Sequence, residues 1–133
     1  MRRTAVIGLA VAAMAAAVLA PAAGAHTVKY DTTVTAKLKK GGKDANTFSG
    51  VVDSTKSKCV MNRTVDLYLR VDNGADSLIG TDATSDLGEW EILPAGELAA
   101  GTYYATAPKV VLKKNKKHRH VCKRATSDTV TVK

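Results

Sequence analysis

The sequence predicts an all-β protein, an antiparallel Greek-key β-sandwich of about seven strands that follows a helical signal peptide. Three observations support this prediction. Helical periodicity is nearly absent after His26. Short segments with apolar residues at every second position recur along the chain, which is the pattern of strands with one buried face. Turn-forming residues separate these segments at a near-regular spacing, as in all-β sandwiches.

The first 25 residues have the organisation of a secretory signal peptide. Arg2 and Arg3 precede an apolar stretch that ends at Pro21, and a small-x-small site follows at residues 23–25. We therefore expect cleavage of residues 1–25 and a secreted protein, extracellular or periplasmic, with no membrane span after processing. The apolar stretch is nearly long enough to stay in a bilayer as an anchor. The cleavage site and the polar sequence that follows it favour removal.

Residues 26–133 are predicted to form a single β-sandwich domain. Removing the leader from 133 residues leaves 108, which is the size of one domain. Without Arg2 and Arg3, the formal charge falls from +8 to +6. This excess of cations predicts attraction to anionic partners.

Three segments in the first half of the domain alternate as strands do. Residues 28–38 place apolar groups at alternate positions over most of their length, and they are rich in Val and Thr. Residues 47–54 form the second predicted strand. Residues 64–71 alternate most clearly, because nearly every second position is apolar. Asn73 and Gly74 then predict a tight turn.

Four segments complete the expected sandwich. Residues 77–84 form a shorter and weaker strand, and residues 89–93 return after another turn. The next predicted strand covers residues 102–112 and is interrupted at Pro108, which cannot donate a backbone hydrogen bond. The chain ends on a strand within residues 127–132.

Cys59 and Cys122 are the two cysteines, and both follow the predicted leader. In an oxidising compartment an even pair most simply forms a structural disulfide. Closing a loop of about 60 residues stabilises a fold by roughly 4 kcal/mol in the chain-entropy model. Free thiols or a shared metal are the alternatives to the disulfide that we predict.

Four short motifs follow one another in a recognisable order. They are FSGVVD (residues 48–53), VDLY (65–68), TSDLGEW (84–90) and GTYYA (101–105). This order resembles the prealbumin-like β-sandwiches, particularly the carboxypeptidase regulatory-like (Ig-like) domains of secreted bacterial proteins, over roughly residues 46–107. The resemblance implies an accessory or structural domain and not a catalyst.

The densest positive charge lies around the second cysteine. Such a group could dock an anionic cell-envelope polymer or another surface protein through salt-sensitive contacts. Specific nucleic-acid binding is not expected, because residues 109–124 contain no interleaved aromatic side chains for bases to stack on. The commoner role of such a charge run is a mobile, solvated loop. The candidate anion-binding residues are Lys113, Lys114, Lys116, Lys117, Arg119, Lys123 and Arg124.

A second hypothesis concerns His26, which becomes the N-terminal residue if cleavage follows Ala25. Its amino and imidazole nitrogens could chelate Cu(II), with His118 or His120 completing the site, because imidazole suits this ion. Exported copper carriers with a small β-sandwich and an N-terminal histidine are similar in outline. No second ligand follows at a diagnostic spacing, and His118 and His120 fall in the segment expected to be a loop.

No motif indicates catalysis or a cofactor. A G-x-S-x-G nucleophile turn is absent, and the three histidines fall in predicted termini or loops. Strand alternation turns most aromatic residues into the core, leaving Tyr68 and one of Tyr103 or Tyr104 outward. We therefore expect an exported, non-enzymatic interaction or structural module, extracellular or envelope-associated, that binds anionic polymers through its basic loop. An exported copper-binding protein is the alternative.

Overall fold

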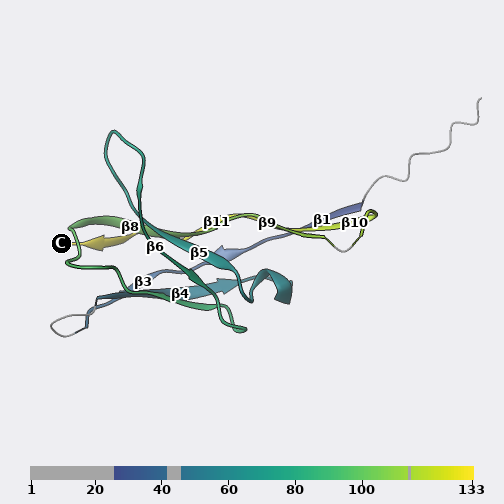
Figure 1. The fold of residues 1–133 in the computed structure, drawn as a ribbon, viewed down its shortest axis with the longest axis horizontal. Helices are drawn as coiled ribbons and strands as arrows, with labels where there is room; N and C mark the ends of the chain where they lie inside the picture. The colour runs from purple at the N-terminus through teal and green to yellow at the C-terminus, as the bar shows by residue number, and fades with distance from the viewer. Residues whose placement is uncertain (1–25, 42–45, 114) are drawn as a thin grey trace, which may run out of the picture.

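The alternating segments form strands, and the protein is all-β, as predicted (Figure 1). A computed structural model describes residues 26–41, 46–113 and 115–133. Within these ranges lie twelve strands, one short 3-10 helix and no α-helix. The elements are β1 (His26–Tyr30), β2 (Thr33–Val34), β3 (Lys37–Lys39), β4 (Thr47–Asp53), η1 (Ser57–Cys59), β5 (Thr64–Leu69), β6 (Ser77–Ala83), β7 (Glu89–Ile92), β8 (Gly101–Ala107), β9 (Val110–Lys113), β10 (His118–Cys122), β11 (Ala125–Thr126) and β12 (Val130–Val132).

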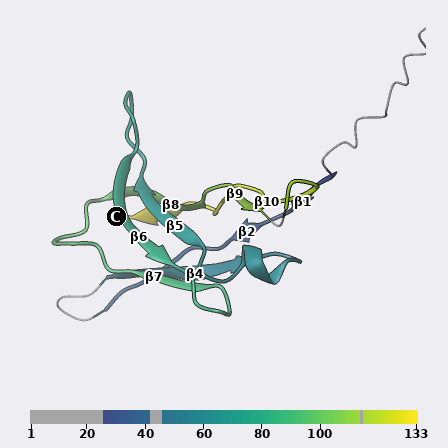
Figure 2. The ribbon, with the colours of Figure 1, turned by 45° about the vertical axis from the view of Figure 1, so that its right-hand side comes forward.

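Two antiparallel layers form a sandwich (Figure 2). One layer has the order β11-β8-β5-β6, and β12 also pairs with β8. In the other layer, β4 pairs with β2 and β3 along one edge and with β7 along the other. The layers meet where β6 lies beside β7, and there the Asp82 carboxylate accepts the backbone N–H of Glu91 at 2.8 Å. Strands β5 to β8 therefore lie in the Greek-key order β8-β5-β6-β7.

The core fills the space between the two layers. Its most deeply buried side chains include Phe48 of β4, Val65 and Leu67 of β5, and Tyr103 of β8. The rings of Phe48 and Tyr103 lie 4.9 Å apart between centroids. The Tyr103 hydroxyl donates to the backbone oxygen of Ala99 at 2.7 Å, so this ring is buried without leaving its polar atom unpaired. Burial also raises the pKa of Tyr103.

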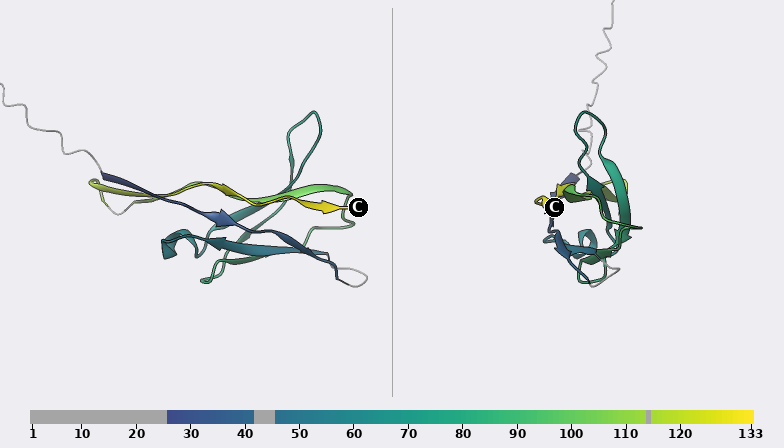
Figure 3. Two further views of the ribbon diagram at one scale, coloured as in Figure 1. Left: turned by 180° about the vertical axis from the view of Figure 1, so that it is seen from behind. Right: turned by 90° about the vertical axis from the view of Figure 1, so that its left-hand side faces the viewer.

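A three-stranded arm extends from one end of the sandwich (Figure 3, left). The chain passes from β8 through Pro108 into β9, turns, and returns as β10 and β11. β1 completes the arm as a parallel partner of β10, with His26 opposite His118 and Tyr30 opposite Cys122. The arm is therefore the outer half of one long hairpin joined by the first described strand.

The structure corrects the sequence-based expectation in three places. Residues 28–38, predicted as one strand, belong to the three strands β1, β2 and β3. β1 pairs in parallel with β10, although an antiparallel sandwich was expected. The basic segment 113–120, expected to be a mobile, solvated loop, includes the end of β9 and the start of β10. Because one strand partner of this segment is β1, far away in sequence, local alternation could not reveal the pairing.

Two sequence-based predictions concern residues outside the described ranges, namely the signal peptide (1–25) and the anion-binding role of Lys114. Of the residues that the structure describes, none belongs to a helix with the length and hydropathy that crossing a bilayer requires. Secretion stays a prediction, and the disulfide is compatible with it.

Cys59 and Cys122 form the predicted disulfide, with their Cα atoms 5.4 Å apart. Both residues are fully buried. Cys59 ends η1, in the connection from β4 to β5, whereas Cys122 ends β10 at the base of the arm. The bond therefore ties the arm to the sandwich across a sequence separation of 63 residues.

We expect the double substitution Cys59→Ser and Cys122→Ser to lower the free energy of unfolding by about 4 kcal/mol, because the unfolded chain regains the entropy of an open loop. Urea unfolding followed by Trp90 fluorescence measures this change. Wild-type protein treated with a reductant should unfold at the same midpoint as the double variant. An unchanged midpoint after complete reduction would contradict the prediction.

Candidate functional site

The arm gathers most of the residues that the sequence singled out. Successive residues of a strand point to opposite faces of a sheet, so the register of the arm sorts them into two faces. Lys29 and Arg119 lie on one face, with Arg119 opposite Thr27 on β1 and Lys113 on β9. Both Lys29 and Arg119 are exposed. This face is called the cationic face below.

The turn between β9 and β10 adds further cations at the tip of the arm. Lys116 and Lys117 are exposed there. The Asn115 side-chain oxygen accepts the backbone N–H groups of Lys117 and His118, both at 2.9 Å. Because one side chain satisfies two backbone donors, residues 115–118 form a local turn on which the two lysines are exposed.

The arm holds the whole charge excess of the domain. Its strands and turn, residues 26–30 and 110–122, contain six Lys and Arg and no Asp or Glu. The rest of residues 26–133 contains twelve residues of each sign, so the sandwich is formally neutral. The segments that build the arm thus carry the whole formal excess of +6, one charge of it on Lys114, which lies outside the described residues. Such a concentration of charge creates a positive field.

The opposite face of the arm carries imidazole and aromatic rings. The rings of His26 and His118 lie 6.4 Å apart between centroids, and those of Tyr30 and His120 lie 5.5 Å apart. The backbone N–H of His26 donates to the oxygen of Lys117 at 2.9 Å. Within the described residues, no three side chains of His, Cys, Asp or Glu lie close enough to hold a metal ion. The structure therefore pairs His26 with His118 but forms no centre of three histidines.

A buried arginine fixes the base of the arm. Arg63, which is 2 % exposed, donates four hydrogen bonds to backbone carbonyls. Nη1 donates to Cys59 at 2.9 Å, and Nη2 donates to Pro108 at 2.7 Å and to Lys123 at 2.9 Å. Nε makes a second bond to Pro108 at 3.2 Å. Pro108 and Lys123 are the points where β8 passes into β9 and β10 passes into β11.

The hydrogen-bond acceptors of the Arg63 guanidinium are all uncharged. Each acceptor is a backbone oxygen, and burial lowers the pKa of Arg63 from its usual value. A guanidinium nevertheless stays protonated in proteins, and its planar fork carries five donors. That shape lets one side chain reach three carbonyls from separate parts of the chain. The direction of the arm is set by this contact and by the adjacent disulfide.

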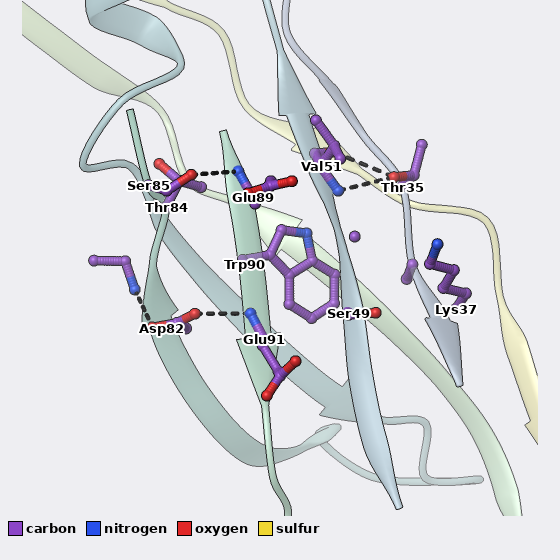
Figure 4. Close-up of a pocket in the computed structure, with 13 residues that line it drawn as sticks. Thr35, Lys37, Ser49, Val51, Asp82, Thr84, Ser85, Glu89, Trp90 and Glu91 are labelled. Carbon is purple, nitrogen blue, oxygen red and sulfur yellow. Dashed lines mark hydrogen bonds between the residues drawn. The ribbon is translucent and has the colours of Figure 1, made fainter. Parts of the chain in front are cut away.

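A groove crosses β3, β4, β7 and β6 of the sandwich (Figure 4). Asp82, Glu89 and Glu91 lie along its β6 and β7 side, and Lys37 lies across from them on β3. The groove is lined by Thr35, Ala36, Lys37, Ser49, Gly50, Val51, Asp82, Ala83, Thr84, Ser85, Glu89, Trp90 and Glu91.

Gly50 shapes this groove because its neighbours leave no room for a side chain. A Cβ at this position would lie 1.8 Å from the backbone oxygen of Thr35 and 2.9 Å from the Trp90 ring. The glycine is therefore required by close backbone approach. Trp90 is 2 % exposed, and its indole N–H has no hydrogen-bond acceptor among the described residues. These contacts belong to the wall of the core, and we assign the groove no ligand.

The predicted anion-binding residues do not all present free charge. Lys123 is exposed but pairs with Asp31 at 2.6 Å, which neutralises it at the base of the arm. Lys113 is the last residue of β9. Of the predicted set, the side chains whose burial the structure describes are all exposed, namely Lys116, Lys117, Arg119, Lys123 and Arg124.

Sequence patterns did not identify the residues that position the arm. Arg63 lies in a polar segment between two strands, and nothing around it distinguishes a buried arginine from a solvated one. Its acceptors at Pro108 and Lys123 are 45 and 60 residues away. The one local signal is Pro108, which interrupts a strand and leaves its carbonyl available for a partner outside the sheet.

Comparisons with known proteins do not assign this site. No family model matches the chain, and no curated protein or solved structure matches it either. The resemblance to carboxypeptidase regulatory-like domains stays a prediction, and the functional argument rests on the arm.

We expect Arg63→Met to lower the free energy of unfolding by about 3 kcal/mol or more, because three backbone carbonyls in buried and partly buried contacts lose their donors. Arg63→Lys should cost nearly as much, since an ammonium cannot reproduce the planar fork. Urea unfolding with the disulfide intact measures both changes. The matched control is Arg124→Met, at an exposed arginine, which should cost less than about 0.5 kcal/mol. A loss for Arg63→Met as small as that of the control would contradict the role of the buried contact.

Proposed function

We propose that this protein is an exported, non-enzymatic module that docks through its arm on an anionic polymer of the cell envelope or the extracellular space. The observation that carries the proposal is the confinement of the formal charge of +6 to the arm, beside a neutral sandwich. A positive field concentrated on one projecting element attracts and orients an anionic partner.

The layout of the cations favours a polymer over a small anion. Lys29 and Arg119 lie on strands, whereas Lys116 and Lys117 lie in the turn at the tip. Each exposed cation alone contributes little, because water and salt screen it. A polymer with many negative charges contacts several cations at once and releases counterions from each contact. The binding strength then comes from the number of contacts.

The base of the arm supports this function by holding the cations in place. The disulfide and the Arg63 contact join the arm to the sandwich on both strands of the hairpin. A ligand that meets a prearranged set of charges does not have to order the chain that carries them. The predicted leader and the disulfide both agree with an exported location.

We expect the protein to bind long-chain polyphosphate, used as a simple polyanion, with an affinity that falls as salt rises. The triple substitution Lys116→Ser, Lys117→Ser and Arg119→Ser should lower the magnitude of the slope of log K against log salt by about 2, at about 0.7 per lost contact. Fluorescence titration between low and physiological salt measures the slope.

A matched control removes the same charge elsewhere. Lys37→Ser, Lys39→Ser and Lys40→Ser take three exposed cations from β3 and the residue after it. This variant should keep a slope close to that of the wild type. Equal losses in the two triple variants would mean that net charge alone drives binding, and no loss in the arm variant would also contradict the proposal.

The pairing of β1 with β10 favours a second candidate function, Cu(II) binding at a processed N-terminus. Cleavage after Ala25 would give His26 a free amine, and this residue lies directly opposite His118. Their rings are 6.4 Å apart, and the bond from the His26 nitrogen to Lys117 keeps this end of β1 beside β10. An amine and two imidazoles are a nitrogen-rich donor set of the kind that suits Cu(II).

On this second candidate, protein that begins at His26 should bind one equivalent of Cu(II). His26→Gln and His118→Gln should each weaken the affinity at least about tenfold, the equivalent of about 1.4 kcal/mol. Arg119→Gln is the control, because Arg119 neighbours His118 but lies on the cationic face. Competition titration against a chelator of known affinity measures these changes. An unchanged affinity in His118→Gln would exclude a site shared by the two histidines.

A further inference from the structure

The outer face of the β8–β5–β6 layer carries a pair of tyrosines. Tyr68 of β5 and Tyr104 of β8 lie directly opposite each other. Their ring centroids are 5.6 Å apart, and the ring planes differ by 20°. The neighbouring residues Leu67 and Tyr103 fill the core, so alternation turns Tyr68 and Tyr104 outward, where both are partly exposed.

The tyrosine pair is held in place by the β5–β6 connection. The Tyr104 hydroxyl donates to the Asp76 carboxylate at 2.5 Å, and the same carboxylate accepts the backbone N–H of Val71 at 3.0 Å. These hydrogen bonds lower the pKa of Asp76, and the bond from Tyr104 raises the pKa of that phenol. The Arg70 guanidinium lies 5.6 Å from the centroid of the Tyr104 ring. The Tyr104 ring is therefore oriented before any ligand arrives, and Tyr68 is stacked against it.

Apolar surface continues from the tyrosines onto β6. Leu78 lies opposite Tyr68 and is 58 % exposed. The register shift between Leu67 and Tyr68 explains this exposure, because it lets Ile79 pack against the core and leaves Leu78 outward. Tyr104, Tyr68 and Leu78 thus form one row across three strands, called the aromatic row below.

Hydroxyl groups surround the aromatic row. The Thr81 hydroxyl donates to the Asp66 carboxylate at 2.8 Å on the same face. The charged groups nearest the row include Arg70, Asp66 and Asp76, and both carboxylates already accept hydrogen bonds. The face therefore combines aromatic surface with hydroxyls and little net charge. The threonines that share it by register are Thr64, Thr81, Thr102, Thr126 and Thr131, which are at least partly exposed, and Thr106, which is buried.

We propose that this face binds a neutral polysaccharide chain. A sugar ring offers C–H groups that pack against aromatic and leucine side chains. Its hydroxyls both donate and accept hydrogen bonds, as do those of the threonines around the row. The small net charge of the face does not favour the polyanions that the arm attracts. The row is narrow and ringed by hydroxyls, unlike the broad apolar centre of a protein interface.

The test is sedimentation of the folded, disulfide-bonded protein with insoluble cellulose, chitin and starch. The buffer contains ~0.5 M salt, at which the Debye length is about 4 Å, so that the attraction of anions to the cations of the arm is screened. The wild type should be retained on at least one of the three. Tyr68→Ala and the double variant Tyr68→Ala, Tyr104→Ala should each lose about tenfold or more in affinity. Tyr104→Phe keeps the ring but loses the bond to Asp76 that orients it, so its loss of affinity should be smaller than that of the double variant.

Two controls separate this proposal from that of the arm. Tyr30→Ala removes a partly exposed tyrosine of the arm, and Lys116→Ser, Lys117→Ser, Arg119→Ser removes charge at its tip. Both variants should bind the polysaccharide as the wild type does. Tyr68→Ala keeps the Tyr104–Asp76 bond, and an unfolding midpoint near that of the wild type shows that the fold is intact.

Three results would overturn the proposal. They are no retention on any of the three polysaccharides, equal retention of the tyrosine double variant and the wild type, and retention that the arm variant loses. The last result would assign the binding to the arm. Loss of polyphosphate binding in the arm variant, with polysaccharide retention unchanged, would support the two functions independently.

Discussion

The structure depends on one junction, where Arg63 and the Cys59–Cys122 disulfide join the arm to the sandwich. A long hairpin that leaves a sandwich has nothing to pack against on two sides, and its backbone carbonyls need donors where the sheet changes direction. Arg63 supplies donors to Pro108 and Lys123, the two points of that change. The disulfide lies beside Arg63 and bonds the base of the arm, at Cys122, to Cys59 of the sandwich. The Arg63 guanidinium can be buried at this junction because the backbone carbonyls around it are already in place. Its four hydrogen bonds to them offset the free-energy cost of removing the cation from water.

This junction allows charge to be separated from the core. The sandwich is formally neutral and owes its stability to burial between two layers, whereas the arm carries the charge excess of +6. Six like charges on a small element repel one another and would loosen an arm held by strand pairing alone. Covalent attachment at Cys122 and pairing with β1 oppose that repulsion. The same arrangement presents the cations to solvent, where a polyanion can reach them.

The arm and the outer face of the β8–β5–β6 layer differ in the chemistry of their exposed side chains. On the arm, exposed lysines and arginine provide attraction that acts at a distance and weakens with salt. On the β8–β5–β6 layer, Tyr68, Tyr104 and Leu78 provide short-range contacts that salt does not screen. The ring of Tyr104 is oriented by Asp76, a residue of the β5–β6 connection, so that this connection has a structural role although it lies outside the core. Two ligand chemistries on one small domain would suit a module that bridges components of an extracellular matrix or envelope.

The sequence by itself determined the all-β class, the order of the main strands, the disulfide and the outward position of Tyr68. These features follow from alternation, turn residues and cysteine count, which are local or need only one pairing. Only the tertiary structure decided that residues 118–122 form a strand, that β1 pairs with it in parallel, and that Arg63 is buried. Each depends on partners tens of residues away: β1 faces β10, and Arg63 reaches Pro108 and Lys123. A charged strand is indistinguishable from a solvated loop until the segments that supply its hydrogen bonds are in place.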